Sequence, residues 1–120
     1  MTKYVTTKDQ NWDTTEVRGA KVERCLLWEG QYNVRSGFFR MPKGLEIPAH
    51  HHASWVQILV LHGKIHVEAV GSAPQIIAAG EYYFVEPGET HTETALDISF
   101  ALFTQVECLV YEVPRQPQLR

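Results

Sequence analysis

Long hydrophobic runs and paired cysteines are scarce in this sequence of 120 residues. No window approaches the roughly 18 consecutive apolar residues that a membrane-spanning helix needs, and the first ten residues contain no apolar core of a secretion signal. The two cysteines, Cys25 and Cys108, are too few for a disulfide scaffold, so we expect reduced thiols. These absences predict a cytoplasmic protein with no membrane partner.

Charge of one sign is not concentrated anywhere in the chain. The formal net charge is only -3, and no basic run or basic helical stripe is present. This pattern argues against a nucleic-acid or anionic-membrane partner, because both require clustered lysine and arginine. The length and an apolar content of 44% fit one globular domain with one core.

Helical periodicity is also missing, and short β-branched and aromatic runs take its place, separated by Gly, Pro or Asp turns. About ten short strands in one domain predict an all-β fold, an antiparallel jelly-roll barrel of two sheets. We expect an irregular lead-in over residues 1–15, the barrel over 16–113 and a polar tail over 114–120. The expected strands cover residues 20–28, 34–41, 45–52, 55–61, 65–70, 75–79, 82–85, 90–94, 98–103 and 106–113.

Three consecutive histidines, residues 50–52, precede the apolar run that begins at Trp55. Side chains alternate between the two faces of a strand, so His50 and His52 point to one face and His51 to the other. Gln57 joins the first pair if the alternation continues through the turn. Two imidazoles with a third polar group nearby are suitable ligands for a divalent metal.

Two spaced motifs carry a family resemblance. In the first, Gly44 is followed after five residues by the histidine triplet, then after four by Gln57 and after five more by Gly63. In the second, Gly80 is followed after five residues by Glu86-Pro87-Gly88 and ends at His91. Both resemble the two cupin motifs, in the same order. The resemblance implies a cupin-type jelly-roll barrel, also called a double-stranded β-helix, with a metal site at His50, His52, Gln57 and His91.

Gln57 departs from the family pattern, which usually has glutamate at this position. Three neutral imidazoles and a neutral amide would leave the charge of a divalent metal uncompensated. We therefore expect the site to favour a small anionic ligand. Fe(II) is the first choice of metal, and Zn, Ni and Mn also suit imidazole ligands. In an alternative arrangement, Gln57 does not bind and the three histidines leave open positions.

The resemblance allows three functions, because the cupin fold hosts many chemistries. The site is similar to that of small cupins that act as non-haem Fe(II) dioxygenases on β-diketones. It is also similar to that of cupins that open unsaturated sugar acids without redox change, for which Glu93 and Glu107 are the candidate proton-moving acids. The third possibility is a metal-binding or small-molecule-binding module without catalysis.

Aromatic residues near the motifs are the candidates for contacting a substrate, and we expect Phe38, Trp55 and Tyr83 to line the mouth of the barrel. Arg35 and Arg40 are more consistent with a solvated outer face than with a substrate carboxylate. The expected strand 20–28 is apolar on both faces. It therefore predicts burial against a second copy of the chain in a homodimer, or against the outer sheet of the same barrel.

Overall fold

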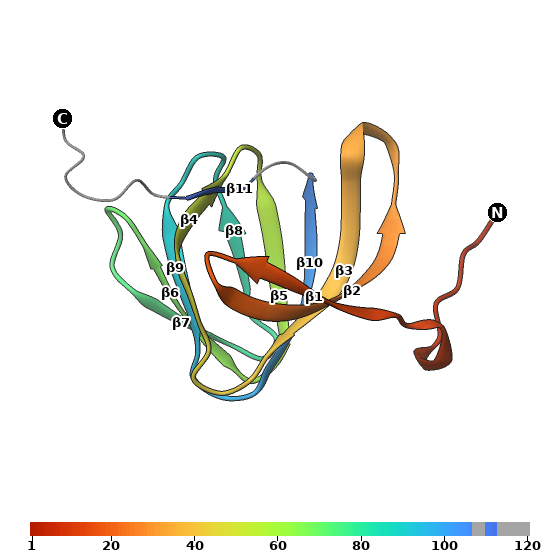
Figure 1. Ribbon diagram of the computed structural model, residues 1–120, viewed down its shortest axis with the longest axis horizontal. Coiled ribbons are helices and arrows are strands. Elements are labelled where there is room, and N and C mark those ends of the chain that lie inside the picture. The colour runs from red at the N-terminus through yellow and green to blue at the C-terminus, as the bar shows by residue number, and fades with distance from the viewer. Residues whose placement is uncertain (107–109, 113–120) are drawn as a thin grey trace.

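The structure is a computed structural model that describes residues 1–106 and strand 110–112. Two antiparallel sheets face each other (Figure 1), with strand orders β1-β2-β3-β10-β5-β8 and β11-β4-β9-β6-β7. The first sheet contains β1 (Trp12–Val17), β2 (Ala20–Glu29), β3 (Val34–Met41), β10 (Ser99–Val106), β5 (Val56–His62) and β8 (Tyr82–Val85). The second contains β11 (Val110–Glu112), β4 (Glu46–His52), β9 (His91–Ala95), β6 (Lys64–Ala69) and β7 (Gln75–Ala78).

The all-β jelly-roll architecture expected from the sequence is confirmed. Besides the strands, the described residues form two short 3-10 helices, η1 (Thr7–Asp9) and η2 (Gln31–Asn33). Within this same part of the chain, no helix is long and apolar enough to span a membrane. Cys108, Glu107 and the expected tail at 114–120 lie outside the described residues.

The core forms where alternate side chains of the two sheets meet. The alternation is clear in β5 and β10, where buried inward positions are followed by outward neighbours that are only partly covered. This alternation leaves one end of the interior to polar side chains of β4 and β9. The buried apolar cluster consists of Ala20, Val22, Phe39, Met41, Ile47, Val56, Ile58, Val60, Ile65, Val85, Ala95, Ala101 and Phe103.

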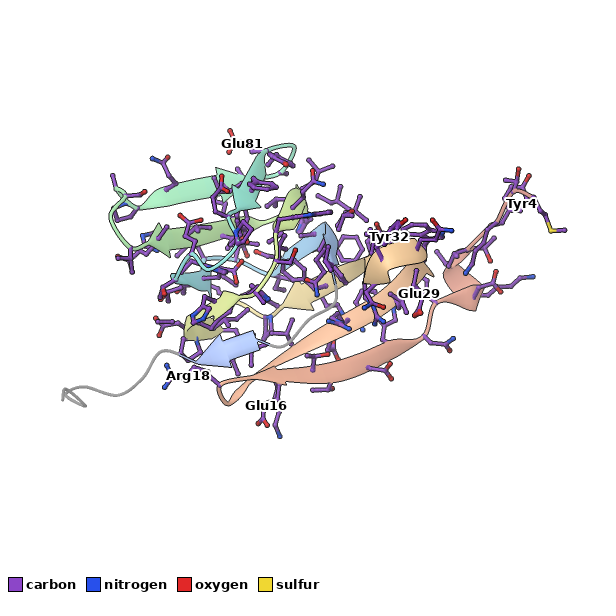
Figure 2. The ribbon with its side chains drawn as sticks, turned by 90° about the horizontal axis from the view of Figure 1, so that it is seen from above. Tyr4, Glu16, Arg18, Glu29, Tyr32 and Glu81 are labelled. Carbon is purple, nitrogen blue, oxygen red and sulfur yellow. The ribbon has the colours of Figure 1, made fainter. Side chains whose placement is uncertain are left out.

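The N-terminal hairpin β1–β2 corrects the expected lead-in, because β1 begins at Trp12 within residues 1–15. The polar sequence of β1 gives no clear strand pattern. The strand has no buried residue and pairs only with β2 in the sheet order. Arg18 and Gly19 both have positive φ, as two-residue type I′ turns require. Arg18 also donates from Nη1 to the carbonyl of Ala49 on β4 at 3.0 Å. Figure 2 shows Glu16 and Arg18 at this turned end of the hairpin, and Glu29 and Tyr32 at the opposite end of β2.

Strand β2 leaves part of its apolar surface uncovered in a single chain. Leu26 is 40% exposed and Trp28 is 44% exposed, whereas Cys25 is buried. The homodimer therefore stays a prediction, which the mass of the protein in solution would test.

Candidate metal site

Three imidazoles converge at one end of the barrel interior. Strands β4 and β9 are antiparallel neighbours, and His50 pairs directly with His91 in their register. His52 lies two residues beyond His50 on the same face. The three side chains can each offer one nitrogen so that these atoms all lie within 4.8 Å of one another. Ring centroids are 4.3 Å apart for His50 and His91 and 5.2 Å apart for His50 and His52. The alternation expected from the sequence thus brings together all three histidines.

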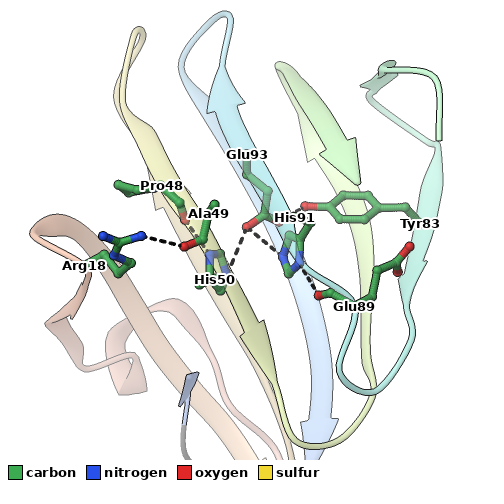
Figure 3. A network of polar contacts seen from close by, with 8 residues as sticks. All are labelled: Arg18, Pro48, Ala49, His50, Tyr83, Glu89, His91 and Glu93. Carbon is green, nitrogen blue, oxygen red and sulfur yellow. Dashed lines mark hydrogen bonds and ion pairs between the residues drawn. The ribbon is translucent and has the colours of Figure 1, made fainter. Parts of the chain in front are cut away.

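Backbone carbonyls fix the orientation of two of the rings. His50 donates from Nδ1 to the Pro48 carbonyl at 2.7 Å, and His91 Nδ1 faces the Glu89 carbonyl at 3.4 Å. A ring that donates from Nδ1 keeps the lone pair on Nε2, which is the atom available to a metal. Figure 3 shows both contacts, with the Nε2 side of each ring turned towards Glu93.

A buried carboxylate lies beside these imidazoles. Glu93, two residues after His91 on β9, is 5% exposed. Its Oε1 lies 3.5 Å from His91 Nε2 and 4.0 Å from His50 Nε2, and the Tyr83 hydroxyl donates to its Oε2. Figure 3 shows this chain of contacts from β4 through β9 to Tyr83 on β8.

The three histidines and Glu93 shift one another's pKa values. Burial lowers the pKa of His52 to about 4, with help from His50 and His91. Burial also lowers the pKa of His50, despite the opposing field of Glu93. Burial acts to lower the pKa of His91 as well, but its interactions with Glu93 and Glu89 together outweigh burial and raise this pKa. Burial would raise the pKa of Glu93, yet His91, Tyr83 and His50 together lower it to about 2.

The metal-free protein is expected to be most stable near pH 6.5. The folded state resists protonation of His50 and His52, so stability falls as the pH drops from about 6.5 towards 4. Protonation of Glu93 lowers the stability further as the pH falls below 4.5, the ordinary pKa of this carboxyl group. The stabilisation that His91 gives to the folded state is fully present below pH 6.5. It is lost as the pH rises through the raised pKa of His91.

Urea unfolding of chelator-treated protein between pH 4 and 9 measures this profile. The His52→Gln variant should show a shallower fall on the acid side, because one of the groups whose protonation opposes folding is removed. A stability that is flat across this range, or highest at pH 5, would contradict the assignment.

A pocket of about 180 Å³ opens beside the three histidines. Its walls are mostly apolar, but Arg24 of β2 contributes a cation whose guanidinium carbon lies 5.4 Å from the centroid of the Phe103 ring. Among the described residues, no carboxylate forms an ion pair with Arg24. The lining residues are Thr15, Glu16, Val17, Val22, Arg24, Phe39, Ile47, His50, His52, Val56, Ile58, His91, Glu93, Phe103 and Gln105.

Gln57 is not brought to the three histidines, which corrects the expected four-residue ligand set. Val56 and Ile58 are the residues of β5 that face the pocket, so Gln57 between them points to the other face. There its Oε1 accepts a hydrogen bond from the Tyr82 hydroxyl at 2.8 Å. The alternative arrangement, in which Gln57 does not bind, agrees with this geometry.

The three aromatic candidates also lie outside the pocket lining. Phe38 is on the outer face of β3, where it packs against Trp12 and Phe100, and Phe39 takes the inward position. Trp55 stacks on Phe84 at a centroid distance of 6.4 Å. Tyr83 is inward but reaches the site only through its hydrogen bond to Glu93.

The remaining sequence candidates lie away from the pocket lining. Arg40 pairs with Glu23 and lies over the Trp12 ring, and Arg35 pairs with Glu29 at 3.6 Å. His51 faces away from His50 and His52, and His62 is exposed at the end of β5. The sequence reasoning missed Arg24, whose side chain lines the pocket from β2.

The donor set fits a divalent transition metal. Three neutral nitrogens within 4.8 Å of one another, two of them on rings oriented by carbonyls, are suitable for Fe, Ni, Zn or Mn. His50 and His91 are 2% and 3% exposed, and such buried polar groups need a partner. Glu93 supplies part of that need, and a metal would supply the rest.

A two-sheet barrel with three histidines at one end of its interior defines a cupin. More specifically, the family model described as the ChrR Cupin-like domain matches residues 1–109, and the chain belongs to this family. No curated protein sequence matches the chain.

Solved structures extend the fold assignment. The polyketide cyclase RemF from Streptomyces resistomycificus is 21% identical with a TM-score of 0.81, over 98% of this chain and 89% of that one. An RmlC-like cupin from Shewanella frigidimarina is 18% identical with a TM-score of 0.72, over 100% and 97%. A protein assigned as an acetylacetone dioxygenase from Methylibium petroleiphilum is 15% identical with a TM-score of 0.75, over 95% and 83%. At these identities the similarity concerns the fold alone.

Proposed function

We propose that the protein is a non-haem Fe(II)-dependent dioxygenase acting on a small anionic or enolisable, diketone-like substrate. The observation that carries the proposal is that one pocket contains both the three histidines and the Arg24 guanidinium. When bound, the metal supplies Lewis acidity and redox chemistry at the histidine end. Similarity in fold to an assigned acetylacetone dioxygenase is compatible with this activity but does not select it.

The chain's own residues would bind and enclose the substrate. Arg24 can hold a carboxylate or enolate oxygen by a charge-assisted hydrogen bond. Val22, Val56 and Phe103 form apolar walls that exclude water from the reacting end. A volume of about 180 Å³ suits a substrate of a few carbon atoms.

Oxygen uptake by protein loaded anaerobically with Fe(II) tests the proposal, using acetylacetone as the first substrate. We expect consumption of one oxygen molecule per diketone cleaved, with label from 18O2 in both products. The His52→Ala variant, prepared in the same way, is the matched control and should consume none. No oxygen uptake with acetylacetone or with longer diketones would contradict the proposal.

A redox-neutral isomerase or lyase acting on a sugar acid is the second candidate. The observation that favours it is Glu93, a buried carboxylate beside His91 that is suitably placed to move a proton. Turnover that is unaffected by removing oxygen would support this function over the first. A metal-loaded protein that turns over neither diketones nor unsaturated uronates would instead be a binding module.

Arg24→Gln is expected to raise KM for an anionic substrate about 10-fold, because a hydrogen bond to a charged group is worth about 1.5 kcal/mol or more. Steady-state kinetics would measure the change, and the Kd of oxalate for the metal-loaded protein would report it without turnover. Arg40→Gln is the matched control, since Arg40 lies outside the pocket lining and pairs with Glu23. Equal effects of the two substitutions would contradict a substrate contact for Arg24.

A further inference from the structure

The alternation of β9 brings an acidic side chain to the histidine cluster. His91, Glu93 and Ala95 are buried, whereas Thr92 and Thr94 between them are only partly covered. Residues two apart on a strand share a face, so His91 and Glu93 both point into the barrel. The carboxylate therefore enters the site from the same strand as the third histidine.

The Glu93 carboxylate lies close to two of the imidazoles, and its distance to His91 is that expected between ligands of one metal. Its Oε1 is 3.5 Å from His91 Nε2 and 4.0 Å from His50 Nε2. Hydrogen bonds between nitrogen and oxygen are about 2.7–3.2 Å long. Two donors that each lie about 2.0–2.2 Å from one ion are separated by roughly 3.0–3.5 Å. The donor atoms that lie within 4.8 Å of one another are those of the three histidines, so the Glu93 side chain would have to move to bring Oε1 into the ligand set.

The other carboxylate oxygen is already held in place. Tyr83 on β8 donates its hydroxyl to Oε2, which leaves Oε1 facing the two imidazoles. Carboxylates that bind metals are commonly oriented by such a hydrogen bond to the oxygen that does not bind. Tyr83 therefore acts as a positioning residue for Glu93.

Strand β5, where the family pattern usually has its acidic residue, contributes no acid to the pocket. Val56 and Ile58 occupy its inward positions, and Gln57 accepts a hydrogen bond from Tyr82 on the other face. The carboxylate that β5 does not supply is present on β9 instead.

We propose that Glu93 is the fourth protein ligand of the metal, through Oε1, and that Tyr83 positions it. This inference rests on the metal binding contained in the proposed function. It changes the charge expected from the sequence, because three imidazoles and one carboxylate leave a divalent ion with a net charge of +1. Preference for an anionic substrate then depends on Arg24 in addition to the metal.

Metal titration of the Glu93→Gln variant tests the proposal, with Zn(II) affinity measured by competition with a chromophoric chelator. The substitution keeps the size of the side chain but replaces the charged oxygen donor with a neutral amide. We expect at least a 10-fold increase in Kd and a changed visible spectrum of the Co(II)-loaded protein. Tyr83→Phe should weaken binding less, by about 2–10-fold, because the ligand itself remains.

Gln57→Glu is the matched control on β5, and it should leave the Zn(II) Kd within 2-fold of the unmodified protein. Infrared difference spectra of the unmodified protein give a readout that does not depend on the folding of any variant. Zinc binding should shift the carboxylate stretching bands, and no such shift would overturn the inference.

Metal binding by the protein and metal binding by Glu93 can be tested separately. Unmodified protein that binds no Zn(II), Co(II) or Fe(II) would overturn the proposed function. Normal metal binding with equal affinity and the same Co(II) spectrum in Glu93→Gln would overturn the role of Glu93 and leave the proposed function standing. Tighter binding in Gln57→Glu would indicate that β5 reaches the metal after all.

Discussion

Replacing His52 with alanine is expected to raise the Kd for a divalent metal at least about 100-fold. His52 is one of three histidines with mutually close donor atoms, and loss of a direct ligand costs at least as much as loss of a group that only orients one. His52 is also the best position for this test, because it is less buried than His50 and His91 and its removal leaves a smaller defect in the core. Zinc titration in competition with a chelator gives the affinity.

His51→Ala is the matched control for this experiment. The two residues are neighbours on β4, but their side chains lie on opposite faces, so His51→Ala should change the Kd less than about 2-fold. Comparable losses in the two variants would indicate that a local disturbance of β4 is responsible. Unchanged affinity in His52→Ala would remove His52 from the site.

Gly63→Ala is expected to destabilise the protein by about 3 kcal/mol. Gly63 connects β5 and β6 with a φ of +90°, which costs about 1 kcal/mol for a residue with a side chain. A Cβ at this position would also collide with the Ile98 carbonyl and lie 2.8 Å from Ser99 Cα, both backbone atoms at the start of β10. Overpacking of this kind adds about 1–3 kcal/mol. Thermal unfolding should show a decrease in Tm of about 10 °C.

Gly71→Ala separates the two causes. Gly71 has a similar φ of +86°, but a Cβ there would meet nothing within 4 Å. Its substitution should therefore cost only the conformational part, about 1 kcal/mol. If both variants lose the same stability in urea unfolding, the close approach of β10 to Gly63 does not matter.

Much of the fold could be predicted because turn residues mark the strand ends. The expected strands 34–41 and 82–85 coincide with β3 (Val34–Met41) and β8 (Tyr82–Val85). Strand β1 could not be found in this way. Its residues are mostly polar, and pairing with β2 supplies its structure where hydrophobic alternation is weak.

The candidate site was predictable only where alternation runs without interruption. His50 and His52 belong to one strand, so their shared face follows from the sequence. Residues 53–55 are not part of any strand, and the face of β5 therefore cannot be extrapolated from β4. This interruption is why Gln57 was expected inside and Val56 is found there.

Arg24 depends on an arrangement that no local pattern contains. Its own strand precedes the histidines by more than twenty residues, and the Arg18 hydrogen bond to Ala49 ties the β1–β2 hairpin to β4. The approach of this hairpin to the pocket is a long-range contact. Spacing within one motif carries no information about it.

The two walls of the pocket belong to different sheets. Strands β4 and β9 provide the histidines and Glu93, whereas β1 and β2 provide Arg24 and part of the opposite rim. The groups that would hold the ion and the groups that would choose the ligand therefore share no hydrogen-bonded ladder. Exchanging the hairpin at residues 12–29 for that of a relative is a direct route to a new selectivity. Such a chimaera would inherit its reactivity from one parent and its choice of substrate from the other.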